Sequence, residues 1–339
     1  MRLGFNPHKD KKQIKSDYFH QVVIPVYIPN EEGYFKDSFV ILQYCLQSLF
    51  KTSHQKTYFT IVNNGSCDEV VDYLNSLYHK KKIQELIHST NIGKLNAILK
   101  GLTGNQFTLI TIADADVLFV NNWQEETYAV FEAFPKTGSV SPCPNSKLLK
   151  YCTTNIFFEK LISESLRFRN VKNPKAMKSF AGSIGNPTLF NKHHLKKYLT
   201  VSNNDVHAVV GAGHFVGTYR SDVFQKLRHS YSVFKLGGES ESELLDKPVS
   251  YQGYWRLSTE DNYAYHMGNT LEDWMPKHVK DLKRNNFVYD KAPHLSKVKS
   301  NAFVNWIKIK VFSRILFRKS FWMLFLRYKG LTKSEAKEY

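Results

Sequence analysis

Short apolar runs alternate with amphipathic stretches along residues 21–134 of the chain. Four of the apolar runs are rich in β-branched residues, which predicts buried strands over 21–29, 58–63, 83–88 and 107–113. Apolar residues at helical spacing follow each run, which predicts helices over 38–50, 69–78, 95–102 and 122–134. This alternation predicts an α/β fold in which βαβ crossovers build a mostly parallel central sheet with helices on both faces.

Polar residues gather where three of the predicted strands end. These ends are Pro25-Val26-Tyr27, Asn63-Asn64-Gly65-Ser66 and Asp114-Ala115-Asp116. Ligands of open parallel sheets bind beyond the carboxyl ends of the strands, so we expect the chemistry there. Residues 139–275 are less regular and richer in Gly and Pro, as expected of substrate loops.

Two carboxylates, Asp114 and Asp116, directly follow the fourth strand. Residues two apart at a strand end can approach one ion, and hard oxygen ligands suit Mg²⁺ or Mn²⁺. Such an ion would hold the two phosphates of a nucleotide-sugar and neutralise the departing diphosphate. Short acidic pairs are common on solvated surfaces, and the buried strand before this pair is what favours a metal site.

Four blocks of sequence resemble the ordered blocks of family 2 glycosyltransferases. They are VVIPVYIPNE from residue 22, IVNNGSCDE from 61, NIGKLNAILKGL from 91 and ITIADADV from 110. The order and spacing of the four blocks are more specific than any one of them, and the resemblance covers residues 20–270. It implies the GT-A fold, a nucleotide diphosphate sugar as donor, a divalent cation and inversion at the anomeric carbon.

The resemblance also implies roles for donor-binding residues. The strand end Pro25-Val26-Tyr27 would line the nucleoside pocket, and Lys94 would approach the nucleotide or its phosphates. A solvated lysine at a helix start is the alternative for Lys94. Asn63 stands where the family usually has an Asp that reads the base, and an amide can both donate and accept, so the base stays open.

Three metal ligands follow from the same resemblance. Asp114 would contact the ribose and the metal, and Asp116 the metal. His266, within Tyr263-Ala-Tyr-His266-Met-Gly-Asn269, resembles the family's late strand that ends in a metal-binding His. Neutral imidazole suits Mn²⁺ better than Mg²⁺.

The general base has three candidates. Inversion needs a carboxylate that takes the proton of the acceptor hydroxyl, and the family supplies it as an acidic pair ahead of a Gly-aromatic step. Glu243 is the first choice and Glu241 the second, although a solvated charge-rich loop is the alternative for 239–246. Asp261 matches the T-E-D of processive relatives but ranks third, because His266 follows too soon for a helix and a returning strand.

Glycines recur in Ala208-Val-Val-Gly211-Ala-Gly213-His-Phe-Val-Gly217, a pattern that superficially resembles a dinucleotide fingerprint. The run comes after an irregular stretch, and no clear βαβ unit follows it. We interpret it as the family's glycine-rich acceptor loop, leading into a helix over 221–227. A tight turn without ligand contact is the alternative.

The composition predicts that the protein works in a reducing environment, and it reveals a basic tail. The chain has 339 residues, 42% of them apolar, and four cysteines without C-x-x-C spacing. These values predict an ordinary buried core and free thiols in a cytoplasm, and no signal-peptide-like apolar region opens the chain. The net charge of +17 is concentrated after residue 276, where 16 Lys and Arg face 4 Asp and Glu.

The tail mixes Trp and Phe with Lys and Arg between residues 301 and 331. No uncharged run there approaches the ~20 residues that span a bilayer. The mixture suits a segment that lies at a membrane interface, and helices docked on the catalytic domain are the alternative. Nucleic-acid binding ranks third, because no recognised module for it is present.

These observations predict a polar lead over 1–16, a catalytic domain over 17–275 and a basic helical tail over 276–339. The function expected is a metal-dependent inverting glycosyltransferase of surface polysaccharide or glycolipid synthesis, acting on a saccharide or lipid-linked acceptor at the cytoplasmic face of a membrane. A nucleotidyltransferase is the closest alternative, but PVYIPNEEGYF lacks its Gly-rich phosphate loop. A non-catalytic adaptor for membranes or polyanions is the other.

Overall fold

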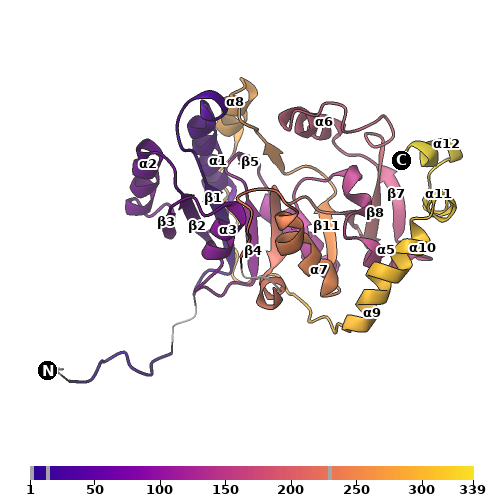
Figure 1. Cartoon of the computed structure of the whole chain (residues 1–339), viewed down its shortest axis with the longest axis horizontal. Coiled ribbons are helices and arrows are strands. Elements are labelled where there is room, and N and C mark those ends of the chain that lie inside the picture. Colours follow the sequence, from indigo (N-terminus) through magenta and orange to yellow (C-terminus); the bar gives the residue numbers. More distant parts are fainter. Residues whose placement is uncertain (1–3, 13–15, 228–230) are drawn as a thin grey trace.

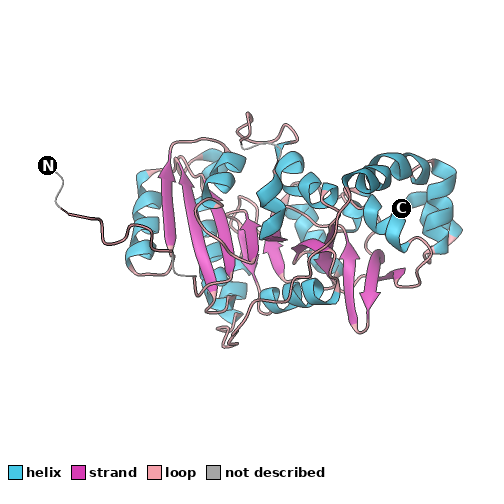
Figure 2. Ribbon diagram, turned by 90° about the horizontal axis from the view of Figure 1, so that it is seen from below, coloured by secondary structure: helices cyan, strands magenta, loops and turns pink. Residues whose placement is uncertain are grey.

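The computed structural model describes residues 4–12, 16–227 and 231–339. Its core is a ten-stranded sheet in the order β3-β2-β1-β4-β10-β6-β11-β9-β8-β7. Figure 2 shows the strands in a row with helices on both sides. The architecture is mixed α/β, and β10, β9 and β7 run against the direction shared by the other strands of this sheet.

The first half of the sheet is parallel and follows the predicted alternation of strands and helices. Its strands are β1 (His20–Val26), β2 (Thr57–Asn64), β3 (Glu85–Ser89) and β4 (Leu109–Ala113). The helices after them are α1 (Ser38–Thr52), α2 (Asp68–His79), α3 (Lys94–Gly101) and α4 (Trp123–Ala133). All eight predicted elements are confirmed, although the first strand ends at Val26 and not at residue 29.

Alternate residues of β1 point to opposite faces of the sheet, which explains how both faces are covered. Val22 and Ile24 belong to the apolar cluster that includes α1, whereas Val23 packs with Leu95 and Ile98 of α3. Every residue of β1 and β4 is buried. Strands buried on both faces read as continuous apolar runs, which is why the sequence identified them.

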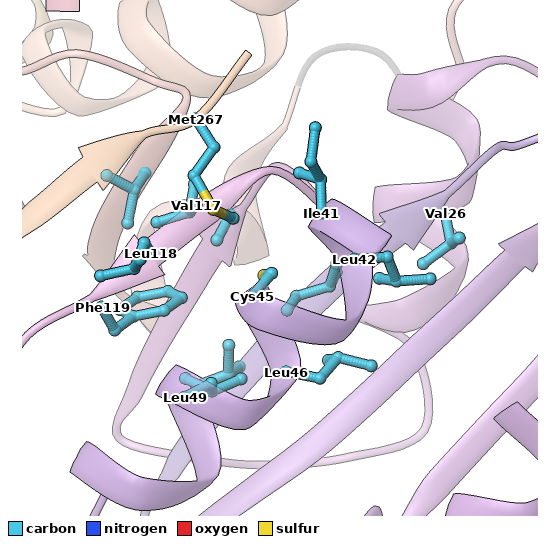
Figure 3. Packing of buried hydrophobic residues seen from close by; sticks show 14 of the residues in the cluster. Val26, Ile41, Leu42, Cys45, Leu46, Leu49, Val117, Leu118, Phe119 and Met267 are labelled. Carbon is cyan, nitrogen blue, oxygen red and sulfur yellow. The ribbon is translucent and has the colours of Figure 1, made fainter. Parts of the chain in front are cut away.

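Helix α1 carries its apolar residues on one side. Figure 3 shows these side chains lying between β5 (Val117–Phe119) and Met267 on one side and Val26 of β1 on the other. They recur at the spacing of a single helix face and comprise Ile41, Leu42, Cys45, Leu46 and Leu49. Because β5 directly follows the Asp114-Ala115-Asp116 turn, this packing fixes the chain on the far side of the two carboxylates.

The second half of the sheet is largely antiparallel. Its strands are β6 (Thr137–Ser141), β7 (Leu166–Asn170), β8 (Lys197–Asn203), β9 (Val206–Val210), β10 (Val216–Arg220) and β11 (Trp255–Thr259). Between them lie α5 (Thr154–Lys160), α6 (Pro174–Ser183) and α7 (Lys247–Tyr251). The segment 221–227, predicted to be a helix, forms a 3₁₀ helix over Ser221–Lys226. A two-stranded sheet pairs β12 (Ala264–His266) with β5.

The tail forms helices that pack on the last strands of the sheet. They are α9 (Ala302–Trp306), α10 (Phe312–Leu316), α11 (Lys319–Tyr328) and α12 (Lys333–Glu338). Helix α8 (Trp274–Asp281) packs elsewhere, on α1, where its Met275 and Val279 join the apolar cluster of that helix. A π-helical segment, Ile307–Val311, joins α9 to α10, and the backbone N–H of Phe168 in β7 donates to the carbonyl of Lys329. In Figure 1 the helices α9 to α12, in yellow, lie at the opposite end of the molecule from the indigo β3, whereas α8, in orange, lies beside α1. No helix in the described part of the chain has the length and apolar character needed to cross a membrane.

Candidate active site

Two pockets open at the carboxyl ends of the parallel strands and meet at Lys94 and Asp114. The larger, here called the strand-end pocket, has a volume of about 580 Å³. The residues that line it include Pro25, Val26, Tyr27, Tyr34, Phe35, Asn64, Asn91 and Asp116. The smaller, the inner pocket, has a volume of about 250 Å³. Its lining includes Met177, Phe180, His214, Phe215, Glu241 and His266.

Strand β4 delivers the two predicted carboxylates to the boundary between the pockets. The strand is buried up to Ala113, and the chain then turns, held by the Asp114 N–H, which donates to the carbonyl of Phe215 at 2.8 Å. The Asp116 carbonyl accepts from the Met267 N–H at 2.8 Å. The pairing of β12 with β5 therefore places His266 beside Asp116, with 3.4 Å between Nε2 and Oδ2.

Asp116 and His266 have free coordinating capacity. Asp116 Oδ1 is buried and has no hydrogen-bond partner among the described residues. Burial raises the pKa of Asp116 to about 6, against the opposing charge of His266, while the neighbouring Asp114 raises it further. His266 is oriented by Ser183, whose Oγ lies 2.9 Å from Nδ1. An unpaired buried oxygen beside an imidazole suits a borderline divalent cation.

The three predicted ligands do not converge on one point. Asp114 Oδ1 lies 2.7 Å from Lys94 Nζ, and within the described ranges no three carboxylate, imidazole or thiol groups are arranged to hold a metal ion. Asp116 with His266 is thus the pair that the structure brings together, and Asp114 is engaged by a lysine.

Lys94 stands between two carboxylates, because its Nζ also lies 3.0 Å from Glu241 Oε1. Burial by itself lowers the pKa of Lys94, but Asp114 and Glu241 outweigh it and raise that pKa. The lysine begins α3 directly after Gly93, whose φ of +90° favours glycine. A Cβ at Gly93 would lie 2.9 Å from Lys235 Cα, so this loop also needs a residue without a side chain.

The three candidates for the base occupy different surroundings. Glu241 lines the inner pocket and contacts Lys94. Glu243 is half-exposed, forms an ion pair with Lys247 and is not among the described residues that line either pocket. Asp261 lines a separate cavity with Glu126 and His207.

His214, which our sequence analysis did not single out, joins Glu241 to a buried ion pair. Its Nε2 lies 3.5 Å from Glu241, and its Nδ1 lies 3.4 Å from Asp246 Oδ2. Asp246 is fully buried and pairs with the buried Arg256. Burial lowers the pKa of His214, but the hydrogen bond and the charge of Asp246, together with the charge of Glu241, outweigh it and raise that pKa. The glycine-rich run that contains His214 was the available signal.

Asn64 lines the strand-end pocket, and Asn63, the residue that the sequence suggested for base recognition, does not. The Asn63 side chain is buried, with Nδ2 3.0 Å from His88 Nδ1 and Oδ1 accepting from the Ser66 N–H. Asn64 lines the strand-end pocket instead, and its Oδ1 accepts from the Ile92 N–H. Successive residues of a strand face opposite ways, so a shift of one position moves the amide out of the pocket.

The family described as Glycosyl transferase family 2 matches residues 22–198, more than half of the 339-residue chain. A nucleotide-sugar-dependent transferase is the class that this family defines, and its members carry the GT-A fold. The chain belongs to family 2 of the glycosyltransferases and is a glycosyltransferase.

Solved structures with similar folds include two glycosyltransferases. One is the mannosyltransferase PcManGT from Pyrobaculum calidifontis in complex with GDP-Man and Mn²⁺, with 12% identity, a TM-score of 0.43, and coverage of 95% of this chain and 75% of that one. The other is residues 1–349 of S. aureus TarS in complex with UDP-GlcNAc, with 14% identity, a TM-score of 0.42, and coverage of 94% and 70%. No curated protein matches the sequence.

Proposed function

We propose that this glycosyltransferase is metal-dependent and inverting, and that it transfers a sugar from a nucleotide diphosphate donor to a hydroxyl acceptor. One observation carries the proposal. The Asp116 and His266 pair and the Lys94 and Glu241 pair both lie at the junction of two pockets, with 3.4 Å and 3.0 Å between the partners. A cation site and a carboxylate are thereby available on two sides of one reaction centre.

The strand-end pocket takes the nucleotide. Tyr27 and Tyr34 supply exposed aromatic surface at its wall, and Asn64 and Asn91 supply amides that can read a base edge. Lys94 stands at the inner end, where it can approach the diphosphate. The bound donor would then extend from this pocket toward the inner one.

Asp116 and His266 would hold the cation, Mn²⁺ or Mg²⁺, and Asp114, which pairs with Lys94 in this structure, would be the third ligand. Such an ion acts as a Lewis acid on the diphosphate when bound. The residues of the chain supply one imidazole and one or two carboxylates, and this mixture favours Mn²⁺ over Mg²⁺. The unpaired Asp116 Oδ1 supports this assignment.

Glu241 is the general base in this mechanism. The acceptor hydroxyl binds in the inner pocket, gives its proton to Glu241 and attacks the anomeric carbon as the bond to the diphosphate breaks. Attack from the side opposite the leaving group inverts the configuration. Glu243 and Asp261 rank below Glu241 because their carboxylates lie outside these two pockets.

The inner pocket has an apolar wall that fits an acceptor sugar. Phe180 and Phe215 stack with 5.2 Å between ring centroids, and Met177 and Ile184 lie beside them. Aromatic and aliphatic walls suit the apolar face of a saccharide or the lipid-proximal part of a lipid-linked one. We place the reaction in surface polysaccharide or glycolipid synthesis at the cytoplasmic face of a membrane, on the support of family membership.

The test is donor turnover. UDP-sugars and GDP-sugars are screened with Mn²⁺ for release of nucleoside diphosphate, and the unmodified protein is compared with Asp116→Asn. We expect release that needs the metal and is lost in the variant. Release of pyrophosphate from a nucleoside triphosphate would point to a nucleotidyltransferase instead. If no donor is turned over and none binds, the result would favour an adaptor.

A further inference from the structure

The helices at the end of the chain have two different faces. Their inner face is buried against β7 and β8 and the helices beside them, in the apolar cluster that includes Leu316, Trp322 and Phe325. Their outer face is not covered by any described residue. We define this outer face as the exposed side chains of α9, the π-helical segment, α10 and α11, together with the neighbouring end of α5.

Large apolar side chains crowd the outer face. Phe303 is 68% exposed and Trp306 53%, and their rings stack with 6.1 Å between centroids. Leu324 of α11 is 63% exposed, and Ile162, after α5, is 83% exposed. Further exposed members are Val304, Val311, Ile315, Phe321, Tyr328, Phe158 and Leu161. Single exposed apolar residues are common, whereas so many on adjacent helices mark an interaction surface.

The part of this face that the tail helices form carries cations and no carboxylate, whereas the exposed Glu164 beyond α5 pairs with Arg167. Residues 301–331 contain seven Lys and Arg and no Asp or Glu. Two of the seven have structural roles, because Lys308 pairs with Glu159 and Lys329 is buried. The remaining five are exposed, and none takes part in an ion pair between described residues. They are Lys310, Arg314, Arg318, Lys319 and Arg327.

We propose that this outer face binds the surface of a bilayer that contains anionic lipids. Exposed rings and aliphatic side chains would enter the headgroup region, and the five cations would lie against the lipid phosphates. Trp is the residue that favours the interface between headgroups and acyl chains, and Trp306 stands at the exposed end of the long helix over 302–316. A protein partner is disfavoured, because the fully buried cores of protein interfaces are depleted of charge, whereas five exposed cations lie among the exposed apolar residues of 302–328.

This inference goes beyond the proposed function and does not depend on it. The outer face lies at the β7 end of the sheet, whereas the strand-end pocket lies beyond β1, β2 and β4. Binding of the outer face to a bilayer therefore leaves the strand-end pocket open to soluble donor. Lipid binding and donor turnover can therefore be measured separately, and either can fail without the other.

The experiment is flotation of the full chain with vesicles of phosphatidylcholine alone and of phosphatidylcholine mixed with phosphatidylglycerol. We expect binding to the anionic vesicles only, weakened by salt. The charge variant Arg314→Gln, Arg318→Gln and Lys319→Gln should lower the partition coefficient by at least about tenfold. Its matched control is Lys80→Gln, Lys81→Gln and Lys82→Gln, three exposed lysines beside β3 that should leave binding unchanged.

Trp306 gives a second measurement that reports the face itself. It is more exposed than the other four tryptophans, so its fluorescence should shift to the blue on anionic vesicles and be quenched by brominated lipids. Phe303→Ser with Trp306→Ser should abolish the shift and weaken flotation while thermal unfolding stays unchanged. Equal losses in the charge variant and its control would overturn the proposal. So would a stable dimer through this face, or binding of single-stranded RNA but not of vesicles.

Discussion

Lys94 Nζ and Glu241 Oε1 lie 3.0 Å apart although 147 positions separate the two residues in the sequence. The lysine begins α3 in the parallel half of the sheet, and the glutamate precedes a short π-helical segment after β10. The contact closes the inner pocket between the two halves and sets one carboxylate beside the residue expected to approach the donor phosphates. It also makes Glu241 the candidate base that can be tested most sharply.

Glu241→Gln should lower kcat by about 10²- to 10⁴-fold, because an amide of the same shape cannot take the acceptor proton. Donor KM should change little. Glu243→Gln is the matched control, since it removes a carboxylate two residues away that pairs with Lys247 in solvent. Steady-state kinetics on both variants decides the assignment. A larger loss of kcat in Glu243→Gln than in Glu241→Gln would identify Glu243 as the base.

Asp116 should make the metal-free protein pH-sensitive. Its folded pKa of about 6 lies above the ordinary value of 3.8, so the ionised carboxylate destabilises the fold above about pH 6, and this penalty is lost as the pH falls below the folded pKa. Asp116→Asn should therefore be more stable than the unmodified protein near pH 8, by up to ~3 kcal/mol, and equal to it below about pH 4. Urea unfolding in EDTA at several pH values measures this difference.

With Mn²⁺ at neutral pH, the unmodified protein should become more stable than Asp116→Asn, because only the unmodified protein gains stability from the bound ion. The affinity for Mn²⁺ should fall as the pH drops through about 6, where Asp116 takes up a proton. Titration calorimetry measures it. Undiminished Mn²⁺ binding by Asp116→Asn would remove this residue from the metal site.

Arg256→Met should destabilise the fold by about 3–5 kcal/mol, since it leaves the Asp246 carboxylate buried without its guanidinium. Lys247→Met breaks an ion pair at the surface and should cost less than about 1 kcal/mol. Midpoints of urea unfolding compare the two. The double variant Arg256→Met with Asp246→Leu should recover part of the loss, and failure to recover any would mean that the pair is not what stabilises this region.

Gly93→Ala should impair donor binding as well as stability. Its φ is +90°, and the new Cβ would lie 2.9 Å from Lys235 Cα, so the loop that lines the strand-end pocket must move. Gly104→Ala is a control with a φ of +82° and no heavy atom within 4 Å of the added Cβ. Both should lose about 1 kcal/mol from backbone strain. Only Gly93→Ala should raise donor KM, and equal donor KM values would contradict the close approach.

The parallel half of the fold could be predicted from the sequence because its signals are local. Buried strands such as 109–113 are apolar except for Thr111, and the helices between them are amphipathic, so periodicity alone located them. The turn Asp114-Ala115-Asp116 and the lysine at the start of α3 were found for the same reason. The antiparallel half gave no such pattern, since several of its strands pair with distant segments: β10 pairs with β4 and β6, and β11 pairs with β6 and β9.

The sequence by itself determined the family, the order of the first eight elements and the carboxylates at the tip of β4, all of which depend on neighbouring residues. Tertiary structure alone decided the rest. It placed Glu241 and not Glu243 beside Lys94, turned Asn64 into the pocket in place of Asn63, and brought His214 onto the buried Asp246. It also gave the tail helices a buried apolar face and an outer face on which cations lie among exposed apolar side chains. These outcomes depend on which distant segments pack together, because burial and pairing across the sheet fix where each side chain points.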